Sequence, residues 1–259
     1  MYWDGSAFKF EDDQYSFQSS WNTSHVSHFF WSKDARVAYS TSHSKANTQY
    51  GITPTVTDVF FTNETTETAK SNFTVNDVTG KYRTLSAEEW KYLFQTRQAS
   101  TVSGVDNARY ALATVNDIVG IIVLPDAYVH PSEVAVLTGI NESNIAYTVN
   151  SYGLSDWEAI ESAGAVFLPV VGYRQTSEPV VFFHLNDQGN YWSSSAYSEN
   201  VNNAIEMYFD NSMSGWPNKK ITSRGYAFCV RLVTDVPAAG DPGNGTEQYK
   251  NNSNPDWFN

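Results

Sequence analysis

The chain has 259 residues, with 16 Lys and Arg against 28 Asp and Glu, which gives a formal net charge of -12 at pH 7. This acidic balance argues against a nucleic-acid partner, because phosphate binding requires clustered positive charge. The longest apolar stretches, such as residues 119–125, are far shorter than the ~18 residues that a membrane-spanning helix needs. We therefore expect neither nucleic-acid binding nor direct membrane insertion by this chain.

The residue types that build metal and redox sites are sparse. Cys229 is the single cysteine, which excludes an intrachain disulfide and a cysteine-rich zinc site. His25 and His28 are three residues apart, but His28 runs directly into three aromatic residues, which favours a structural role. The acidic cluster at 11–13 has no EF-hand spacing and is typical of a solvated face. We therefore predict no metal and no cofactor.

The clearest helix signal lies at residues 85–97. Ser86 and Glu89 form a capping box, in which each side chain accepts a hydrogen bond from the backbone N–H of the other residue. Trp90 and Phe94 follow at the spacing of one helix face. The pattern predicts a helix that packs its aromatic face against a core.

A second helix is predicted at residues 155–164. Ser155 and Glu158 repeat the capping-box spacing. Gly164 suits the position just after a helix end, where the left-handed conformation favours glycine.

Most other regular structure is predicted to be strand. Strands are expected at 111–115, 119–124, 165–171, 204–209 and 227–233. Asn116 and Asp117 separate the first two, which predicts a hairpin. In 204–209, apolar residues alternate with Glu206 and Tyr208, which predicts a half-buried strand.

Three polar stretches have no clear periodicity. Residues 40–55 and 186–203 are rich in Ser, Thr, Asn and Tyr, and we interpret them as long loops of the kind that carry function. Residues 236–259 begin with several Pro and Gly and continue with polar residues, so they are predicted to form a linker or flexible tail.

An ordered set of motifs covers most of residues 82–233. The set comprises YRTLS at 82–86, EW at 89–90, YLF at 92–94, TR at 96–97, ALATV at 111–115, GIIVLPD at 120–126, Trp157 with ESAGAVFLP at 161–169, GYR at 172–174, GNYWSSS at 189–195 and VRLV at 230–233. As a set these resemble the Fibrobacter succinogenes major paralogous domain, which is common in surface proteins of gut Bacteroidetes. The segments FKFEDDQY at 8–15 and HFFWS at 28–32 are similar to regions that precede this domain in such proteins.

The resemblance implies an α+β, C-type-lectin-like fold, with two helices, a small twisted antiparallel sheet and long loops. This domain would span residues 80–235, with residues 1–79 as a strand and loop segment packed on it. Family members carry a signal sequence and often a lipid-anchoring cysteine. The resemblance therefore implies that the chain is a fragment of an exported lipoprotein at the cell surface. Within the motifs, we expect Trp192 to be scaffold and the hydroxyls of 193–194 to satisfy backbone groups.

The resemblance also places the binding surface in the window 197–226. Planar amides, carboxylates and exposed aromatic rings suit the recognition of sugar hydroxyls or peptide groups. The candidate ligand-binding residues are Tyr197, Glu199, Asn200, Asn202, Asn203, Tyr208, Asp210, Asn211, Met213, Trp216, Asn218, Lys219 and Tyr226. The predicted function is a non-enzymatic adhesin or receptor-binding module for a glycan or a cell-surface protein.

Three alternatives stay open at the level of the sequence. The chain could be a structural subunit of a pilus or surface assembly, joined through its 236–259 tail. It could be a variable protein of a diversity-generating retroelement, as some family members are, with 197–226 as the mutagenised window. It could also be a carbohydrate enzyme, if the fold brings a suitable pair of carboxylates across a cleft. No nucleophile elbow, zinc-protease motif or phosphate loop occurs in the sequence.

Overall fold

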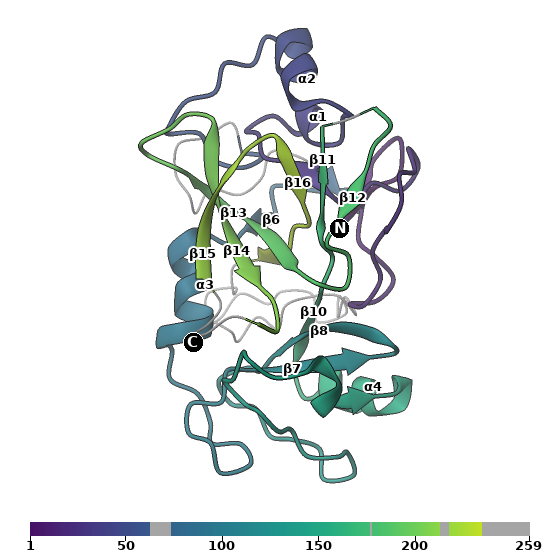
Figure 1. Cartoon of the computed structure of the whole chain (residues 1–259), viewed down its shortest axis with the longest axis vertical. Helices are drawn as coiled ribbons and strands as arrows, with labels where there is room; N and C mark the ends of the chain where they lie inside the picture. Colours follow the sequence, from purple (N-terminus) through teal and green to yellow (C-terminus); the bar gives the residue numbers. More distant parts are fainter. Residues whose placement is uncertain (63–73, 177, 213–217, 235–259) are drawn as a thin grey trace.

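The structure is a computed structural model that describes residues 1–62, 74–176, 178–212 and 218–234 (Figure 1). These residues combine four α-helices with several small, mostly antiparallel sheets, so the predicted α+β class is confirmed. In Figure 1, α1 and α2 lie at one end of the molecule and α4 at the other, with β13, β14 and β15 between them. The predicted tail at 236–259 lies outside the described residues.

The helices are short. They are α1 (Ala35–Ala38), α2 (His43–Tyr50), α3 (Ala87–Lys91) and α4 (Leu154–Ser162), with a π-helical turn η1 (Tyr92–Thr96) and a 3-10 turn η2 (Tyr147–Val149). Within the described part of the chain, none of them has the length and apolar character to cross a membrane.

α3 starts with the predicted capping box. The Ser86 hydroxyl accepts a hydrogen bond from the Glu89 N–H at 3.2 Å, and the Glu89 carboxylate accepts one from the Ser86 N–H at 2.8 Å. Trp90 and Phe94 are buried, as their spacing predicted. The continuation is not an ordinary α-helix, because the backbone widens into η1 after Lys91.

The predicted capping box of α4 is wrong. The helix begins at Leu154, with Gly153 as its N-cap and no side-chain cap, so Ser155 lies inside the first turn. β9 ends at Tyr152, directly before Gly153. The helix starts earlier than predicted because the Gly153 carbonyl already accepts a hydrogen bond from the Trp157 N–H at 3.0 Å. The predicted end is confirmed, since Gly164 has a positive φ of 92°.

α2 lies in the stretch that we interpreted as a loop. Only Ala46 among its residues is buried, so the helix has no apolar periodicity that the sequence could reveal. Its ends stabilise it instead. The Ser42 hydroxyl accepts from the Lys45 N–H at 3.3 Å, and Gly51 closes the helix in the left-handed conformation.

The strands form five small sheets among the described residues. The sheet orders are β1-β2-β4-β5, β10-β8-β7-β9, β12-β11-β16-β3, β13-β14-β15 and β17-β6. The bounds are β1 (Tyr2–Trp3), β2 (Phe8–Lys9), β3 (Phe29–Phe30), β4 (Thr74–Val75), β5 (Val78–Thr79), β6 (Tyr82–Thr84), β7 (Tyr110–Val115), β8 (Ile118–Val123), β9 (Ser151–Tyr152), β10 (Val166–Pro169), β11 (Tyr173–Gln175), β12 (Phe182–Phe183), β13 (Gly189–Ala196), β14 (Asn203–Phe209), β15 (Asn218–Ser223), β16 (Tyr226–Phe228) and β17 (Leu232–Thr234).

The predicted hairpin joins β7 and β8. Asn116 and Asp117 have positive φ angles of 47° and 65°, which is the two-residue turn that favours the right-handed twist of a hairpin. β10 pairs with β8 on the other side, and α4 contributes Trp157 and Ile160 to a core shared with Phe167 of β10.

β13 runs through the second stretch that we interpreted as a loop. Its residues are almost all buried, although many are Ser or Asn. The polar groups are satisfied inside the sheet region, as expected for the Trp-Ser-Ser motif. The Ser193 hydroxyl donates to the Ile205 carbonyl at 2.5 Å, and the Ser195 hydroxyl accepts from the Ala87 N–H at 3.0 Å.

The N-terminal segment shares a sheet with the rest of the chain. β3 pairs antiparallel with β16. We call the contact between the N-terminal segment and the later strands the seam. Two indole groups form hydrogen bonds across it in opposite directions: Trp31 Nε1 donates to the Ser193 carbonyl at 2.8 Å, and Trp192 Nε1 donates to the Phe29 carbonyl at 2.7 Å. Both tryptophans are fully buried, so segments far apart in sequence form one continuous core.

A buried ion pair between Arg224 and Asp58 stabilises this seam. Arg224, which is 1% exposed, donates to Asp58 Oδ2 at 2.8 Å and to the Thr55 carbonyl at 2.8 Å. Its Nε donates to the Asn203 carbonyl at 3.2 Å, and its guanidinium lies 4.2 Å from the centre of the Trp31 ring. Arg224 thus fixes the 55–58 segment to the start of β14.

Asp58→Asn should lower the free energy of unfolding by about 3–5 kcal/mol, because it leaves the buried guanidinium without a counter-charge. Lys45→Ala is the matched control, since Lys45 pairs at 3.5 Å with Glu178 and both side chains are exposed; the expected change there is below about 1 kcal/mol. Urea denaturation of the three proteins measures both values. Equal stability of Asp58→Asn and the parent chain would contradict the importance of this pair.

Candidate functional site

The described part of the predicted surface comprises a loop at 197–202, the strands β14 and β15, and residues 210–212 after β14. β14 and β15 pair in register from Asn203 with Ser223 to Tyr208 with Asn218. Met213 and Trp216 lie outside the described residues, and so does the side chain of Asn218.

The 197–202 loop is held by its own hydrogen bonds. The Tyr197 N–H donates to the Asn203 carbonyl at 3.1 Å, and the Tyr197 hydroxyl donates to Glu199 at 2.7 Å. The Asn200 side chain accepts from the Asn202 N–H at 2.9 Å. Glu199, Asn200 and Asn202 are exposed, so the loop presents a carboxylate and two amides to solvent from a defined backbone.

The β14–β15 hairpin has two chemically different faces, because successive side chains of a strand alternate. Lys219 points toward α3 and pairs with Glu88 at 3.2 Å. Lys220 points the other way, where its ammonium lies 4.4 Å from the centre of the Tyr208 ring and 3.9 Å from Glu206. The predicted surface therefore combines residues that lie on opposite faces of the hairpin.

Tyr208 is placed differently from the exposed loop residues, since only 9% of it is accessible. Its hydroxyl donates to Asp210 at 2.6 Å, and burial together with this bond raises the pKa of the phenol. Asp210 also accepts from the Ser212 N–H at 2.8 Å. Tyr208 therefore orients the Asp210 carboxylate, and Asn211 is exposed beside it.

An aromatic group that the sequence analysis missed lies next to this face. The Tyr173 ring on β11 stacks on Phe183 at 5.5 Å and on His184 at 5.7 Å, and it meets the predicted site residue Tyr226 edge-on at 5.3 Å. We call these four residues the aromatic platform. Phe183 is 36% exposed, His184 is exposed, and the two tyrosines are half-buried. No local sequence signal joins residues so far apart.

A carboxylate borders the aromatic platform. His184 Nδ1 lies 2.6 Å from Asp187, and the charges of Asp187 and Asp210 both contribute to the raised pKa of Tyr208. Gly172 shapes this corner, because its φ of 61° and the close approach of the Phe183 carbonyl exclude a larger residue. The platform thus combines apolar rings with hydrogen-bond acceptors.

Glu206 lies beneath this face. The predicted alternation, with apolar residues buried and Glu206 exposed, is wrong at this point of β14. It is 1% exposed, whereas Ile205 is only half-buried. The reason is that both faces of β14 are covered: its cross-strand partner Trp192 belongs to a second core cluster. Burial raises the pKa of Glu206 to about 7, partly offset by a 2.6 Å hydrogen bond from Thr222.

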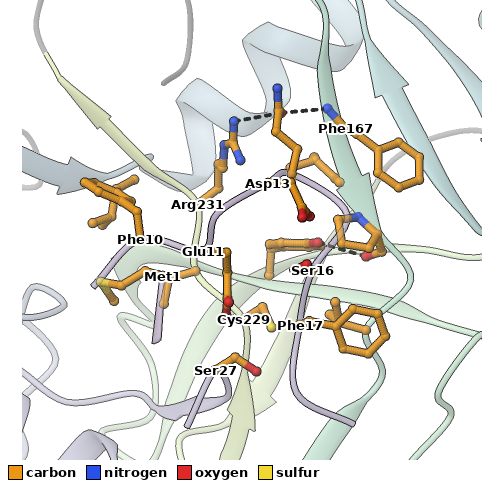
Figure 2. Close-up of a pocket in the computed structure, with 17 residues that line it drawn as sticks. Met1, Phe10, Glu11, Asp13, Ser16, Phe17, Ser27, Phe167, Cys229 and Arg231 are labelled. Atoms are coloured by element: carbon orange, nitrogen blue, oxygen red, sulfur yellow. Dashed lines mark hydrogen bonds between the residues drawn. The ribbon is translucent and has the colours of Figure 1, made fainter. Parts of the chain in front are cut away.

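A small cavity of about 50 Å³ lies where residues 10–17 meet β10 and residues 229–232 (Figure 2). Gln14 links two sides of the cavity, because its side-chain oxygen accepts hydrogen bonds from the Phe167 N–H and from Arg231, each at 2.9 Å. Cys229 lines the cavity, and burial raises the pKa of its thiol to about 12, so it stays protonated at neutral pH. We interpret this cavity as part of the packing of the N-terminal segment.

The histidines and the acidic cluster serve separate structural contacts. His25 stacks on Tyr2 at 3.9 Å and pairs with Glu11 at 3.0 Å, whereas buried His28 bonds to the Val171 carbonyl at 2.9 Å. The prediction that residues 11–13 form a solvated face is therefore wrong for Glu11, whose side chain is 10% exposed. Among the described residues, no group of three or more His, Cys, Asp or Glu could hold a metal ion.

Comparison with protein-family models, with curated proteins and with solved structures finds no match to this chain.

The raised pKa of Glu206 makes stability depend on pH. The folded protein keeps this proton up to about pH 7, whereas a free carboxyl loses it near 4.5. Full stability is therefore present below about pH 4.5 and is lost as the pH rises through 7, by about 3 kcal/mol from this group. Glu206→Gln should remove the loss and be the more stable protein at pH 8. Urea denaturation from pH 4.5 to 8 tests this, and identical pH profiles would contradict it.

Proposed function

We propose that the chain is a non-enzymatic ligand-binding module, an adhesin or receptor-binding domain, of an exported bacterial surface protein. The proposal includes a C-type-lectin-like architecture for the main domain. It is supported by the order of the matched motifs along the fold: they begin at β6 and α3, pass through the β7–β8 hairpin and β10, and end at β13 and β17. In this proposal α3 and α4 would be the two helices that the resemblance implies.

The observation that carries the proposal is the aromatic platform. Large rings that stay exposed in a folded protein mark surfaces suited to binding. A sugar ring has an apolar C–H face that can stack on Phe183 and Tyr173, while its hydroxyls donate to the carboxylates of Asp187 and Asp210. Aromatic rings provide this contact area at little cost in side-chain entropy. A glycan is therefore the ligand class that this surface suits best.

The 197–202 loop extends the proposed surface. The Asn202 carbonyl accepts from the Arg224 N–H at 2.9 Å, and Tyr226 follows two residues later. The exposed groups of Glu199, Asn200 and Asn202 are thereby fixed next to the strand that carries Tyr226. Binding residues commonly lie on such loops, positioned by a rigid scaffold.

A glycan array probed with the purified chain tests this function, with Phe183→Ala as the decisive variant. Phe183 is partly exposed, so its loss should leave the fold intact while weakening glycan binding about tenfold, which corresponds to about 1.4 kcal/mol. Tyr92→Ala is the matched control, because Tyr92 is a similarly exposed aromatic residue on η1, at 41%. It should bind like the parent chain.

Binding that survives Phe183→Ala would contradict the placement of the site. A negative array followed by specific capture of a cell-surface protein would assign a protein ligand to the module. Absence of both kinds of binding would contradict the proposed function.

A further inference from the structure

A second cavity lies between α3 and the β14–β15 hairpin, on the face of the sheet opposite the aromatic platform. Its volume is about 120 Å³. The residues that line it are Ala87, Trp90, Lys91, Gln95, Glu206, Met207 and Lys219. Lys219 is the one proposed ligand-binding residue that lines this cavity. The cavity therefore lies outside the function proposed above.

The wall of this cavity contains an unused hydrogen-bond donor. Trp90 is 3% exposed, and its indole N–H has no hydrogen-bond partner among the described residues. An indole nitrogen can only donate. Buried polar groups normally have hydrogen-bond partners. An unpaired donor beside a cavity therefore indicates that a molecule bound in the cavity supplies the acceptor.

Two cationic side chains also lie at the cavity. Lys91 and Lys219 flank it, and Lys219 pairs with the exposed Glu88 at 3.2 Å. Glu206 carries its carboxylate on the other face, toward Thr222 and Lys220. Lys91 and Lys219 thus supply positive charge at the cavity, within a chain of net charge -12.

The backbone widens where the cavity opens. The Arg97 N–H donates to the Tyr92 carbonyl at 3.1 Å, five residues back, which defines the π-helical turn η1. Such turns are rare and often occur at functional sites. Here the turn carries Gln95, whose exposed side chain lines the cavity and can bond to a hydroxyl.

We propose that this cavity binds an acidic monosaccharide, with the sugar carboxylate accepting from the Trp90 indole N–H and pairing with Lys91 and Lys219. The volume of about 120 Å³ is below the roughly 150 Å³ of an apolar cavity that accommodates benzene, so the carboxylate and one edge of the ring would enter it and the rest of the sugar would lie at the opening, beside the exposed Lys219 and Gln95. Met207 and Ala87 provide the apolar wall for the ring, and Gln95 faces its hydroxyls. Lys219 and Gln95 have exposed, flexible side chains, so their ends can move to admit the carboxylate to the indole.

Titration with glucuronate, followed through the indole N–H signals in nitrogen-15 NMR spectra, tests the site directly. The Trp90 signal is the one absent from Trp90→Phe. Glucuronate should shift this signal, and glucose should not. The double variant Lys91→Ala with Lys219→Ala should weaken glucuronate binding about tenfold. Lys45→Ala is the matched control, because Lys45 is likewise an exposed lysine paired with an exposed glutamate, and it should leave the affinity unchanged.

Propionate separates the carboxylate from the sugar. Much weaker binding of propionate than of glucuronate supports a sugar acid, and equal affinity would overturn the sugar part of the assignment. Equal shifts with glucose and glucuronate would overturn the role of the carboxylate. A Trp90 signal that does not move at millimolar glucuronate would overturn the site. None of these outcomes bears on the aromatic platform, which the Phe183→Ala experiment tests separately.

Discussion

The buried guanidinium of Arg224 is the constraint on which the arrangement of the chain depends. A charge removed from water costs several kcal/mol unless it is paired and fully hydrogen-bonded. Arg224 meets this requirement with partners from three distant segments: Asp58 and Thr55 on one side, Asn203 on another, and the Trp31 ring beneath. Any rearrangement of one segment would leave the charge unsatisfied, so the N-terminal segment and the β14–β15 hairpin are positioned together.

The alternation of side chains along β14 and β15 then divides the chemistry of the hairpin. Lys220 and Glu206 lie on the face that carries the Tyr208 ring, whereas Lys219 and Met207 face α3. Two consecutive lysines therefore serve opposite surfaces. One surface is rich in rings and acceptors, and the other offers donors and positive charge. A single hairpin can in this way present two binding chemistries without any change in backbone.

The features that sequence analysis predicted correctly are local. The capping box of Ser86 and Glu89 and the Asn116-Asp117 turn are satisfied within a few residues, so their pattern is visible in the sequence. α2 was missed because its caps, not an apolar face, stabilise it. β13 was missed because its Ser and Asn residues look solvated but bond inside the protein.

The candidate site was predicted only in part, for the same physical reason. The window 197–226 includes Tyr226, but the aromatic platform needs Tyr173, Phe183 and His184, which only the register of β11, β12 and β16 brings together. The burial of Glu206 likewise depends on a second core cluster that covers β14 from the far side. Such non-local contacts leave no periodic signal along the chain.

Several buried polar groups lie around the proposed binding surfaces. Arg224, Glu206, Ser193 and Ser195 all lie on or beside the strands that carry the 197–202 loop. Polar contacts of this kind add little net stability compared with apolar packing, but they permit one geometry where apolar side chains would allow several. A surface whose backbone is fixed before a ligand arrives loses less conformational entropy on binding. The polar core beneath β14 and β15 therefore favours recognition by a preformed surface, and this is the property that the proposed binding function requires.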